Sequence, residues 1–237
     1  MKEITRFLLA ESIIHGEPVL LAATAGSSNE KTGDMAQIYI LNPDDYPLAI
    51  SKAGLDERVC GTCPLRHSLG GACYVVLFMG PRQVYKGWVD TGKRIDNDQE
   101  FLELLKGKKV RFGSYGDPAH IPAYLVSEII AGSAGHTAYT HQWRNPAVSA
   151  IWKGRAMASC DTVSHLRTAE SKGWAGFLAT PELNLSGVVT CDNEVSGVQC
   201  WDCMRCNGSN GSVRLLPHGA RAESHPSMPK QAPKKGR

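Results

Sequence analysis

The stretch KVRFGSYGDPAHIPAYLVSEII, residues 109–130, predicts the fold class of this chain. Residues 110–113 form a short strand-like run. Asp117 followed by Pro118 is typical of a helix start, because Asp is a good capping residue and proline suits the first helical turn. We therefore predict a helix over residues 118–130. A strand followed closely by a helix is the repeating unit of α/β proteins.

The same pattern continues toward the C-terminus. Residues 156–159 and 176–179 are predicted strands. Residues 161–172 between them are a predicted helix, which Asp161 caps and Gly173 ends. Consecutive strand–helix units imply parallel strands, and in such folds the chemistry gathers at the C-terminal ends of the strands.

The N-terminal half adds further elements. We expect strands over residues 18–23, 37–41 and 74–78, and a helix over residues 98–105, whose acidic first turn suits a helix N-terminus. The predicted fold class is therefore α/β. We expect a partial or irregular (β/α) barrel with a cysteine-rich, metal-bound segment at its C-terminal end.

The composition is that of a globular protein. Of 237 residues, 42% are hydrophobic and 21% are charged, which is ordinary for a folded domain. We expect one domain over residues 1–216 and a disordered, basic, proline-rich tail over residues 217–237. The net charge of +3 is too small to indicate nucleic-acid binding by itself, and we interpret the tail as a solubilising terminus rather than a nucleic-acid contact.

The chain shows no sign of membrane insertion or export. No apolar run approaches the roughly 18 residues that a membrane span requires, and the start of the chain lacks the small-residue cleavage site of a secretory signal. We expect no membrane partner and a cytoplasmic location, in the host cell if a phage encodes the protein. Cytosolic thiol buffers keep cysteines reduced, so the eight cysteines are expected as thiols.

The first cysteine group, called group 1 from here on, consists of Cys60, Cys63 and Cys73. The two-residue spacer between the first two lets both thiolates reach one metal from a single turn, and Gly70 and Gly71 allow the chain to bend back. Three protein ligands leave one coordination position open, which favours metal chemistry. In the alternative interpretation His67 closes the site, and group 1 holds a structural zinc.

The second cysteine group, called group 2, consists of Cys191, Cys200, Cys203 and Cys206. Tandem two-residue spacers are typical of [4Fe–4S] proteins and favour a cluster over zinc. Structural zinc remains the alternative, because four-cysteine zinc sites share these spacers. Cys160 stands alone, and we interpret it as a buried thiol rather than a ligand.

Five segments, taken in order, resemble the phage gene product 88 family. They are CP…CY at residues 63–74, VRFGSYGDP at residues 110–118, HTAYTHQW at residues 136–143, SCDTVSHLRTAESKGW at residues 159–174, and the cysteine tail that ends at residue 208. Together they cover residues 60–208, which is most of the chain that we expect to be ordered.

That family is similar in layout to radical S-adenosylmethionine (SAM) enzymes. The resemblance implies a [4Fe–4S] cluster on group 1 whose fourth iron site binds the amino-acid end of SAM. Reductive cleavage of SAM then yields a 5′-deoxyadenosyl radical that takes a hydrogen atom from the substrate. The group 1 spacing, C-x2-C-x9-C, differs from the C-x3-C-x2-C spacing usual in that superfamily.

The resemblance also implies a reaction class and partners. Enzymes of this kind isomerise or rearrange unactivated positions. If a phage encodes the protein, the implied substrate is a small molecule or a modified nucleobase, in the hypermodification of thymidine in viral DNA. The sequence-based function is therefore an iron–sulfur isomerase.

Residues at predicted strand ends complete the predicted site. We expect Ser114 and Gly116 to contact the cofactor, Gly116 because glycine lets a ligand approach the backbone. The predicted catalytic residues, with His141 lining the same mouth, are Asp117, Tyr139 and Asp161. For Asp117 a plain turn with a helix cap is an equally good interpretation.

The rival hypothesis has no catalysis. In it the chain is a zinc-stapled module that binds nucleic acid or protein, and both cysteine groups only hold loops together. Closure of group 1 by His67, or scattered positions of the predicted catalytic residues, would favour this module.

Overall fold

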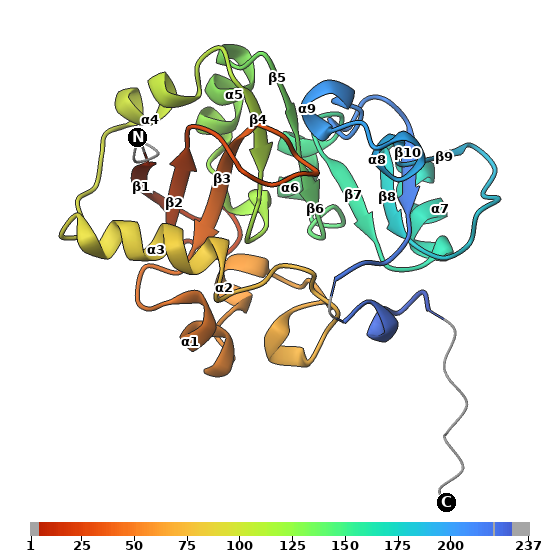
Figure 1. Cartoon of the computed structure of the whole chain (residues 1–237), viewed down its shortest axis with the longest axis horizontal. Coiled ribbons are helices and arrows are strands. Elements are labelled where there is room, and N and C mark those ends of the chain that lie inside the picture. Colours follow the sequence, from red (N-terminus) through yellow and green to blue (C-terminus); the bar gives the residue numbers. More distant parts are fainter. Residues whose placement is uncertain (1–4, 220, 229–237) are drawn as a thin grey trace, which may run out of the picture.

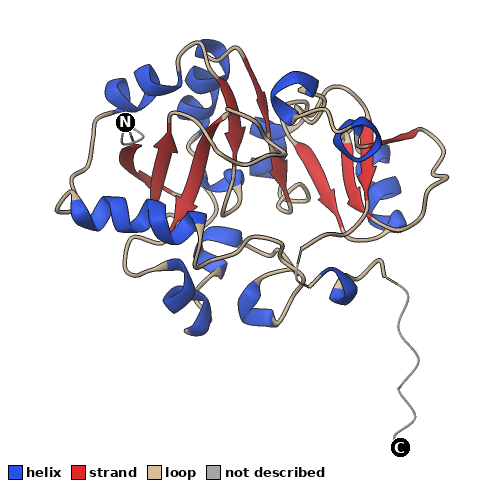
Figure 2. Ribbon diagram, in the orientation of Figure 1, coloured by secondary structure: helices blue, strands red, loops and turns tan. Residues whose placement is uncertain are grey.

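The computed structural model describes residues 5–219 and 221–228, which form an α/β protein with two five-stranded sheets. Figure 1 shows the sheets side by side across the molecule, and Figure 2 shows helices on their outer faces and edges. In chain order the strands are β1 (Thr5–Glu11), β2 (Pro18–Thr24), β3 (Ala36–Leu41), β4 (Lys109–Phe112), β5 (Gly135–Thr137), β6 (Tyr139–Thr140), β7 (Met157–Cys160), β8 (Gly176–Ala179), β9 (Val188–Thr190) and β10 (Ser212–Leu215).

The first sheet is mixed. Its order is β1-β2-β3-β4-β5, with antiparallel pairs up to β3 and parallel pairs from β3 to β5. Strand β2 is buried almost throughout, and this explains its nearly unbroken apolar sequence PVLLAAT.

The second sheet is entirely parallel, in the order β6-β7-β8-β10-β9. Only Ala138 separates β5 from β6, so the chain passes directly from one sheet into the other. The strands of the described residues do not close into a barrel.

Helices and short 3-10 turns (η) connect the strands. They are α1 (Pro47–Lys52), α2 (Glu57–Cys60), η1 (His67–Leu69), α3 (Gly80–Asp90), α4 (Asp98–Leu105), η2 (Pro118–His120), α5 (Ala123–Gly132), α6 (Pro146–Trp152), α7 (Val163–Ser171), α8 (Asp192–Ser196), α9 (Cys200–Cys203) and η3 (Ala222–Ser224). Helix α4 has the predicted bounds, and Asn97 forms a capping box with Glu100 at its start. None of the helices in the described part is long and apolar enough to cross a membrane.

Three predicted elements differ from the structure. The predicted helix 118–130 is interrupted after His120, because Pro122 forces Ile121 into an extended conformation, and α5 starts afterwards. Residues 74–78 form no strand; the Val75 carbonyl instead accepts a hydrogen bond from His67. Asp161 does not cap the following helix, because Thr162 does.

The C-terminal segment also differs in part from the expected disorder. Residues 217–219 and 221–228 are described, and they include η3 and a His225 that is only 6% exposed. The Ser227 hydroxyl donates a hydrogen bond to the Ala179 carbonyl at 2.6 Å, which ties this segment to the end of β8. Residues 229–237 of the predicted tail lie outside the described residues.

Candidate metal centre

The C-terminal ends of the parallel strands carry three of the predicted side chains. Asp117 follows β4, His141 follows β6, and Asp161 follows β7. Because parallel strands end at one edge of their sheet, these side chains meet there. Group 1 approaches the same edge from α2, which lies below the strands in Figure 1.

Asp117 joins three segments at this edge. One carboxylate oxygen accepts the Ala119 backbone N–H at 3.0 Å, and the other accepts the His141 backbone N–H at 2.8 Å. The Asp117 backbone N–H donates to the Val59 carbonyl at 2.7 Å, which brings α2 and Cys60 beside β4. Burial raises the pKa of this carboxyl, although these hydrogen bonds oppose the shift. Asp117 therefore caps η2 and also links β4 to β6.

His141 lies between group 1 and Asp161. Its Nε2 is 3.9 Å from the Cys63 sulfur and 3.2 Å from the Asp161 carboxylate. The other Asp161 oxygen is 3.6 Å from His165 Nδ1. Burial opposes the charged imidazolium, but the charges of Cys63 and Asp161 outweigh it and raise the pKa of His141 well above its ordinary value.

The group 1 thiols are close enough to influence one another. Burial and then the charges of Cys63 and Cys73 raise the pKa of Cys60, and burial is also the main reason why the pKa of Cys73 is raised to about 11. The loop between Cys63 and Cys73 is closed by a hydrogen bond from the Cys73 N–H to the Leu65 carbonyl at 3.0 Å. A bound cation would lower these thiol pKa values, because it stabilises the thiolates.

Tyr115 and Gly116, which directly precede Asp117, pack behind group 1. The Tyr115 hydroxyl donates a hydrogen bond to the Cys60 sulfur. Gly116 has φ +80°, and a Cβ atom there would lie 2.5 Å from the Ile40 carbonyl oxygen. Gly116 is therefore required by close packing against β3, rather than by the approach of a cofactor. The predicted cofactor contact Ser114 is hydrogen-bonded to the Gln37 side chain.

His67, the predicted fourth ligand of the zinc alternative, is engaged by a backbone carbonyl in this structure. Its Nε2 hydrogen-bonds the Val75 carbonyl at 2.8 Å. The histidine that comes closest to completing group 1 is instead His141, which the chain supplies from the end of β6. The zinc alternative thus keeps a candidate fourth ligand, but a different one from the predicted residue.

Group 2 lies at the opposite end of the strands. The Cys200 and Trp201 amides donate to the carbonyls of Lys31 and Thr32, in the loop that precedes β3, at 2.8 and 3.1 Å. The Ala138 amide, just before β6, donates to the Cys206 carbonyl at 3.1 Å. Figure 1 accordingly shows α9 above the strands, whereas α2 lies below them.

The four group 2 thiols also form an electrostatic cluster. Burial is the main cause that raises the pKa of Cys206 to about 12; the charges of the other three cysteines add to it. The Cys203 thiol donates to the Asp192 carboxylate at 3.0 Å, and Arg205 Nε bonds the same oxygen at 3.0 Å. Through the backbone contacts of group 2, the segment from β9 to α9 packs against the N-terminal ends of β3 to β7.

Tyr139 is not part of the mouth that Asp117 and Asp161 share. It packs against the small apolar cluster of Met157, Cys206 and Val213, apart from the main core, and its hydroxyl hydrogen-bonds the Cys206 sulfur. The predicted catalytic residues are thus brought together in part: the two aspartates converge through His141, and Tyr139 belongs to the surroundings of group 2.

No disulfide links the described cysteines, and no group of three or more His, Cys, Asp or Glu side chains within residues 5–219 and 221–228 has an arrangement ready to hold a metal ion. The donor set nevertheless fits a thiolate-bound metal, because each group gathers thiols alone or with one imidazole. Cys160 lies in the core, 4% exposed, and its thiol donates to the Ala158 carbonyl.

Sequence reasoning missed three residues of the strand-end site, namely Tyr115, His165 and His225. Tyr115 is hidden inside the GSYGD turn, and no pattern signals that its hydroxyl turns back to Cys60. His165 stands four residues after Asp161 in the sequence, a helical spacing that offered a signal for their contact. His225 comes from the segment expected to be disordered, and it lies in electrostatic range of Asp161.

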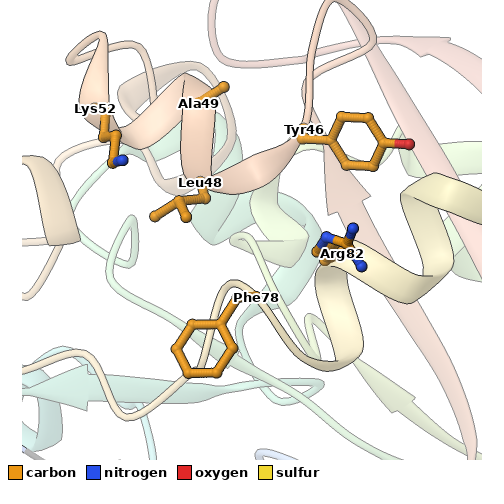
Figure 3. Close-up of a pocket in the computed structure, with 6 residues that line it drawn as sticks. All are labelled: Tyr46, Leu48, Ala49, Lys52, Phe78 and Arg82. Carbon is orange, nitrogen blue, oxygen red and sulfur yellow. The ribbon is translucent and has the colours of Figure 1, made fainter.

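A separate hollow lies between the start of α1 and the start of α3. Figure 3 shows its lining: Tyr46, Leu48, Ala49, Lys52, Phe78 and Arg82. Its walls are mostly apolar, and Arg82 lies over the Tyr46 ring at 6.0 Å. It contains no cysteine and none of the predicted site residues, so we assign it no part in the chemistry.

Comparisons with protein-family models, with curated proteins and with solved structures gave no match for this chain.

Proposed function

We propose that this chain is an iron–sulfur enzyme of the radical SAM type, with a [4Fe–4S] cluster held by group 1 at the C-terminal ends of the strands. The observation that carries the proposal is that three thiols meet Asp117, His141 and Asp161 at this one edge. The wider setting is compatible with it, because two mostly parallel sheets follow one another directly through Ala138. In parallel α/β folds this edge is where active sites lie.

The chemistry then divides between cofactor and chain. A cluster bound by group 1 supplies the electron for reductive cleavage of S-adenosyl-L-methionine. Asp161 accepts hydrogen bonds at the mouth, and His141 holds one of its oxygens in place. Asp117 fixes the backbone of His141, so these groups are positioned before a substrate arrives. The reaction class we propose is isomerisation of a modified nucleobase, as in the bacteriophage gene product 88 family that the chain resembles.

Group 2 has a structural role in this proposal. It lies at the N-terminal ends of the strands, away from the mouth, and it ties segments that are distant in the sequence. Both a second cluster and zinc fit its four thiols.

A specific observation favours a second candidate function. His141 Nε2 lies 3.9 Å from the Cys63 sulfur, so small side-chain shifts would make it a fourth ligand of group 1. A site of three cysteines and one histidine is a closed structural zinc site. The chain would then be a zinc-stapled binding module for nucleic acid or protein, without catalysis.

Metal and sulfide analysis of protein purified without oxygen separates the two candidates. The enzyme predicts a brown protein with at least about four irons and four sulfides per chain. The triple variant Cys60→Ser, Cys63→Ser and Cys73→Ser loses this iron, whereas Cys160→Ala, a matched control in the core, keeps it. The loaded wild type, but not the triple variant, then releases 5′-deoxyadenosine from SAM under reducing conditions. A colourless protein with zinc and no sulfide would eliminate the enzyme and leave the module.

A further inference from the structure

The sheet face opposite the main core, between the two cysteine groups, carries an arginine that pairs with no acidic side chain of the described residues. Seven other arginines of the described residues pair with carboxylates, namely Arg6, Arg58, Arg66, Arg94, Arg167, Arg205 and Arg214. Arg111 makes no ion pair with a carboxylate of the described residues; it donates to the Tyr74 hydroxyl at 2.9 Å and lies over the Tyr139 ring at 5.3 Å. A partly buried guanidinium of this kind lacks the anion that usually accompanies it.

Alternation of side chains along β4 places Arg111 on the face of the sheet opposite the main core. Arg111 is the third residue of β4, and its register partners are Gln37 on β3 and Thr137 on β5. The two residues that flank it on β4, Val110 and Phe112, are fully buried on the opposite face. The guanidinium therefore projects from the middle of the sheet, between group 1 and group 2.

Aromatic rings flank this arginine on both sides. Tyr139 and Phe177, from β6 and β8, pack edge to face with ring centroids 4.6 Å apart. Tyr74, which follows Cys73 directly, is 46% exposed and lies 5.1 Å from the His218 ring. Partly exposed aromatic rings beside a cation are the features that bind a nucleotide, with the rings stacking on the base and the arginine holding the phosphate.

Other charges on this face do not replace the missing anion. Lys31 lies in electrostatic range of His218 and Cys200, so it adds positive charge. Glu194 lies in range of His218, but it is already paired with Arg214 at 3.2 Å. Lys109, on the same strand face, is occupied by the Trp201 carbonyl at 2.6 Å. Arg111 and Lys31 are thus the cations of this face that no carboxylate or carbonyl group of the described residues occupies, and an incoming phosphate would meet both.

We propose that Arg111 binds the phosphate of a nucleotide whose base stacks on the rings of Tyr139 and Phe177 or of Tyr74. This inference rests on the proposed function, because it names the substrate class of that enzyme: a nucleobase carried on a nucleoside phosphate, bound on the sheet face between group 1 and group 2. The phosphate contact positions the nucleotide with one end near group 1. Arg111 is a binding residue here, and it takes no part in the chemistry.

Calorimetric titration of the purified, metal-loaded chain with thymidine 5′-monophosphate tests the proposal. We expect binding that weakens at least about tenfold in Arg111→Gln, because a charge-assisted phosphate contact is lost. Arg111→Lys keeps the charge but loses the two-pronged geometry, so it should fall between the two. Arg155→Gln, which removes an exposed arginine two residues before β7, should bind like the wild type.

Two further ligands separate phosphate recognition from base recognition. Thymidine without phosphate should bind weakly and equally to wild type and Arg111→Gln. Either Phe177→Leu or Tyr74→Leu should weaken the binding of both ligands, since each removes ring surface without removing charge, and the variant that does so identifies the rings on which the base stacks; no change in either variant would overturn base stacking at this face. Tighter binding of a single-stranded oligothymidylate than of the monomer would place the nucleotide in a polymer, and equal binding would identify the free nucleotide.

The alternative role of Arg111 is to balance the thiolate charge of group 2. Measuring the metal content of each variant separates this role from phosphate binding. If Arg111→Gln loses metal but binds thymidine 5′-monophosphate as the wild type does, the proposal is overturned. Wild-type binding that Arg111→Gln does not change would overturn it too. A brown protein that binds no nucleotide would overturn this inference alone. A zinc protein that binds nucleotide through Arg111 would support this inference and eliminate the proposed enzyme.

Discussion

His120 is the most completely buried titratable side chain near the strand ends. It has no exposed surface; its Nδ1 is 2.7 Å from the Ser12 hydroxyl, and its Nε2 has no hydrogen-bond partner among the described residues. Burial, with a smaller effect of His15, lowers the pKa of His120 from an ordinary 6.5 to about 3. The folded protein therefore keeps this ring neutral.

This gives stability a defined pH dependence. Below about pH 6.5 the unfolded chain binds a proton at His120, whereas the folded chain does not. The free energy of unfolding therefore falls as the pH drops toward about 3. Between pH 7 and pH 5 this histidine should account for about 2 kcal/mol of the loss. Urea unfolding of wild type and His120→Gln at both pH values measures the difference, and an equal loss in both proteins would contradict the prediction.

The segment after β4 illustrates how one element constrains another. Ser114 and Tyr115 continue alongside β3: the Ser114 amide donates to the Ile38 carbonyl at 2.9 Å, and the Ile40 amide donates to the Tyr115 carbonyl at 2.8 Å. Gly116 then passes so close to Ile40 and Val59 that no side chain fits. The position of Cys60, next to Val59, therefore depends on a glycine at the end of another strand.

Gly116→Ala tests this dependence against a matched control. Gly92 also has a positive φ, +69°, but a Cβ atom there would meet nothing within 4 Å. We expect Gly92→Ala to lower the free energy of unfolding by about 1 kcal/mol, from backbone strain alone. Gly116→Ala should cost at least about 2 kcal/mol more, because it adds overpacking to the same strain. If the two variants lose similar free energies of unfolding in urea, the residues packed around Gly116 behind group 1 move to accommodate a Cβ atom at little cost.

Across the whole molecule the two cysteine groups have different consequences for stability. Group 1 sits in one local loop at the C-terminal ends of the strands. Group 2 joins the segment around α9 to the loop before β3 and to Ala138, which are remote in sequence. A metal bound to group 2 would order residues 191–206, the segment that makes these remote backbone contacts, so its binding free energy contributes directly to folding.

Chelation should reveal this difference. We expect a strong chelator to lower the Tm of the wild type by at least about 5 °C, and to do the same to the group 1 triple serine variant. A group 2 variant with all four cysteines changed to serine should have a lower Tm that the chelator no longer changes. A chelator effect that disappears with group 1 instead would assign the structural metal to the other end of the strands.

Local features of the sequence determined much of the secondary structure. Helix α4 and strand β8 have the predicted bounds, because a capping box and a short apolar run act within a few residues. The thiols of each cysteine group lie in electrostatic range of one another, as their spacing suggests, whereas their role as metal ligands stays a prediction. Pro122 is a local signal for the interruption after His120, but the prediction of one helix over residues 118–130 did not take it into account.

Only the tertiary structure decided which side chains meet. Tyr139 and His141 are two residues apart, yet one contacts Cys206 and the other Cys63, because β6 ends at Thr140 and the chain turns after it. That the two cysteine groups occupy opposite ends of the strands depends on how the segments after β3 and after β9 fold back over the sheet. Such paths are set by long-range packing and strand register, and neither residue spacing nor periodicity encodes them locally.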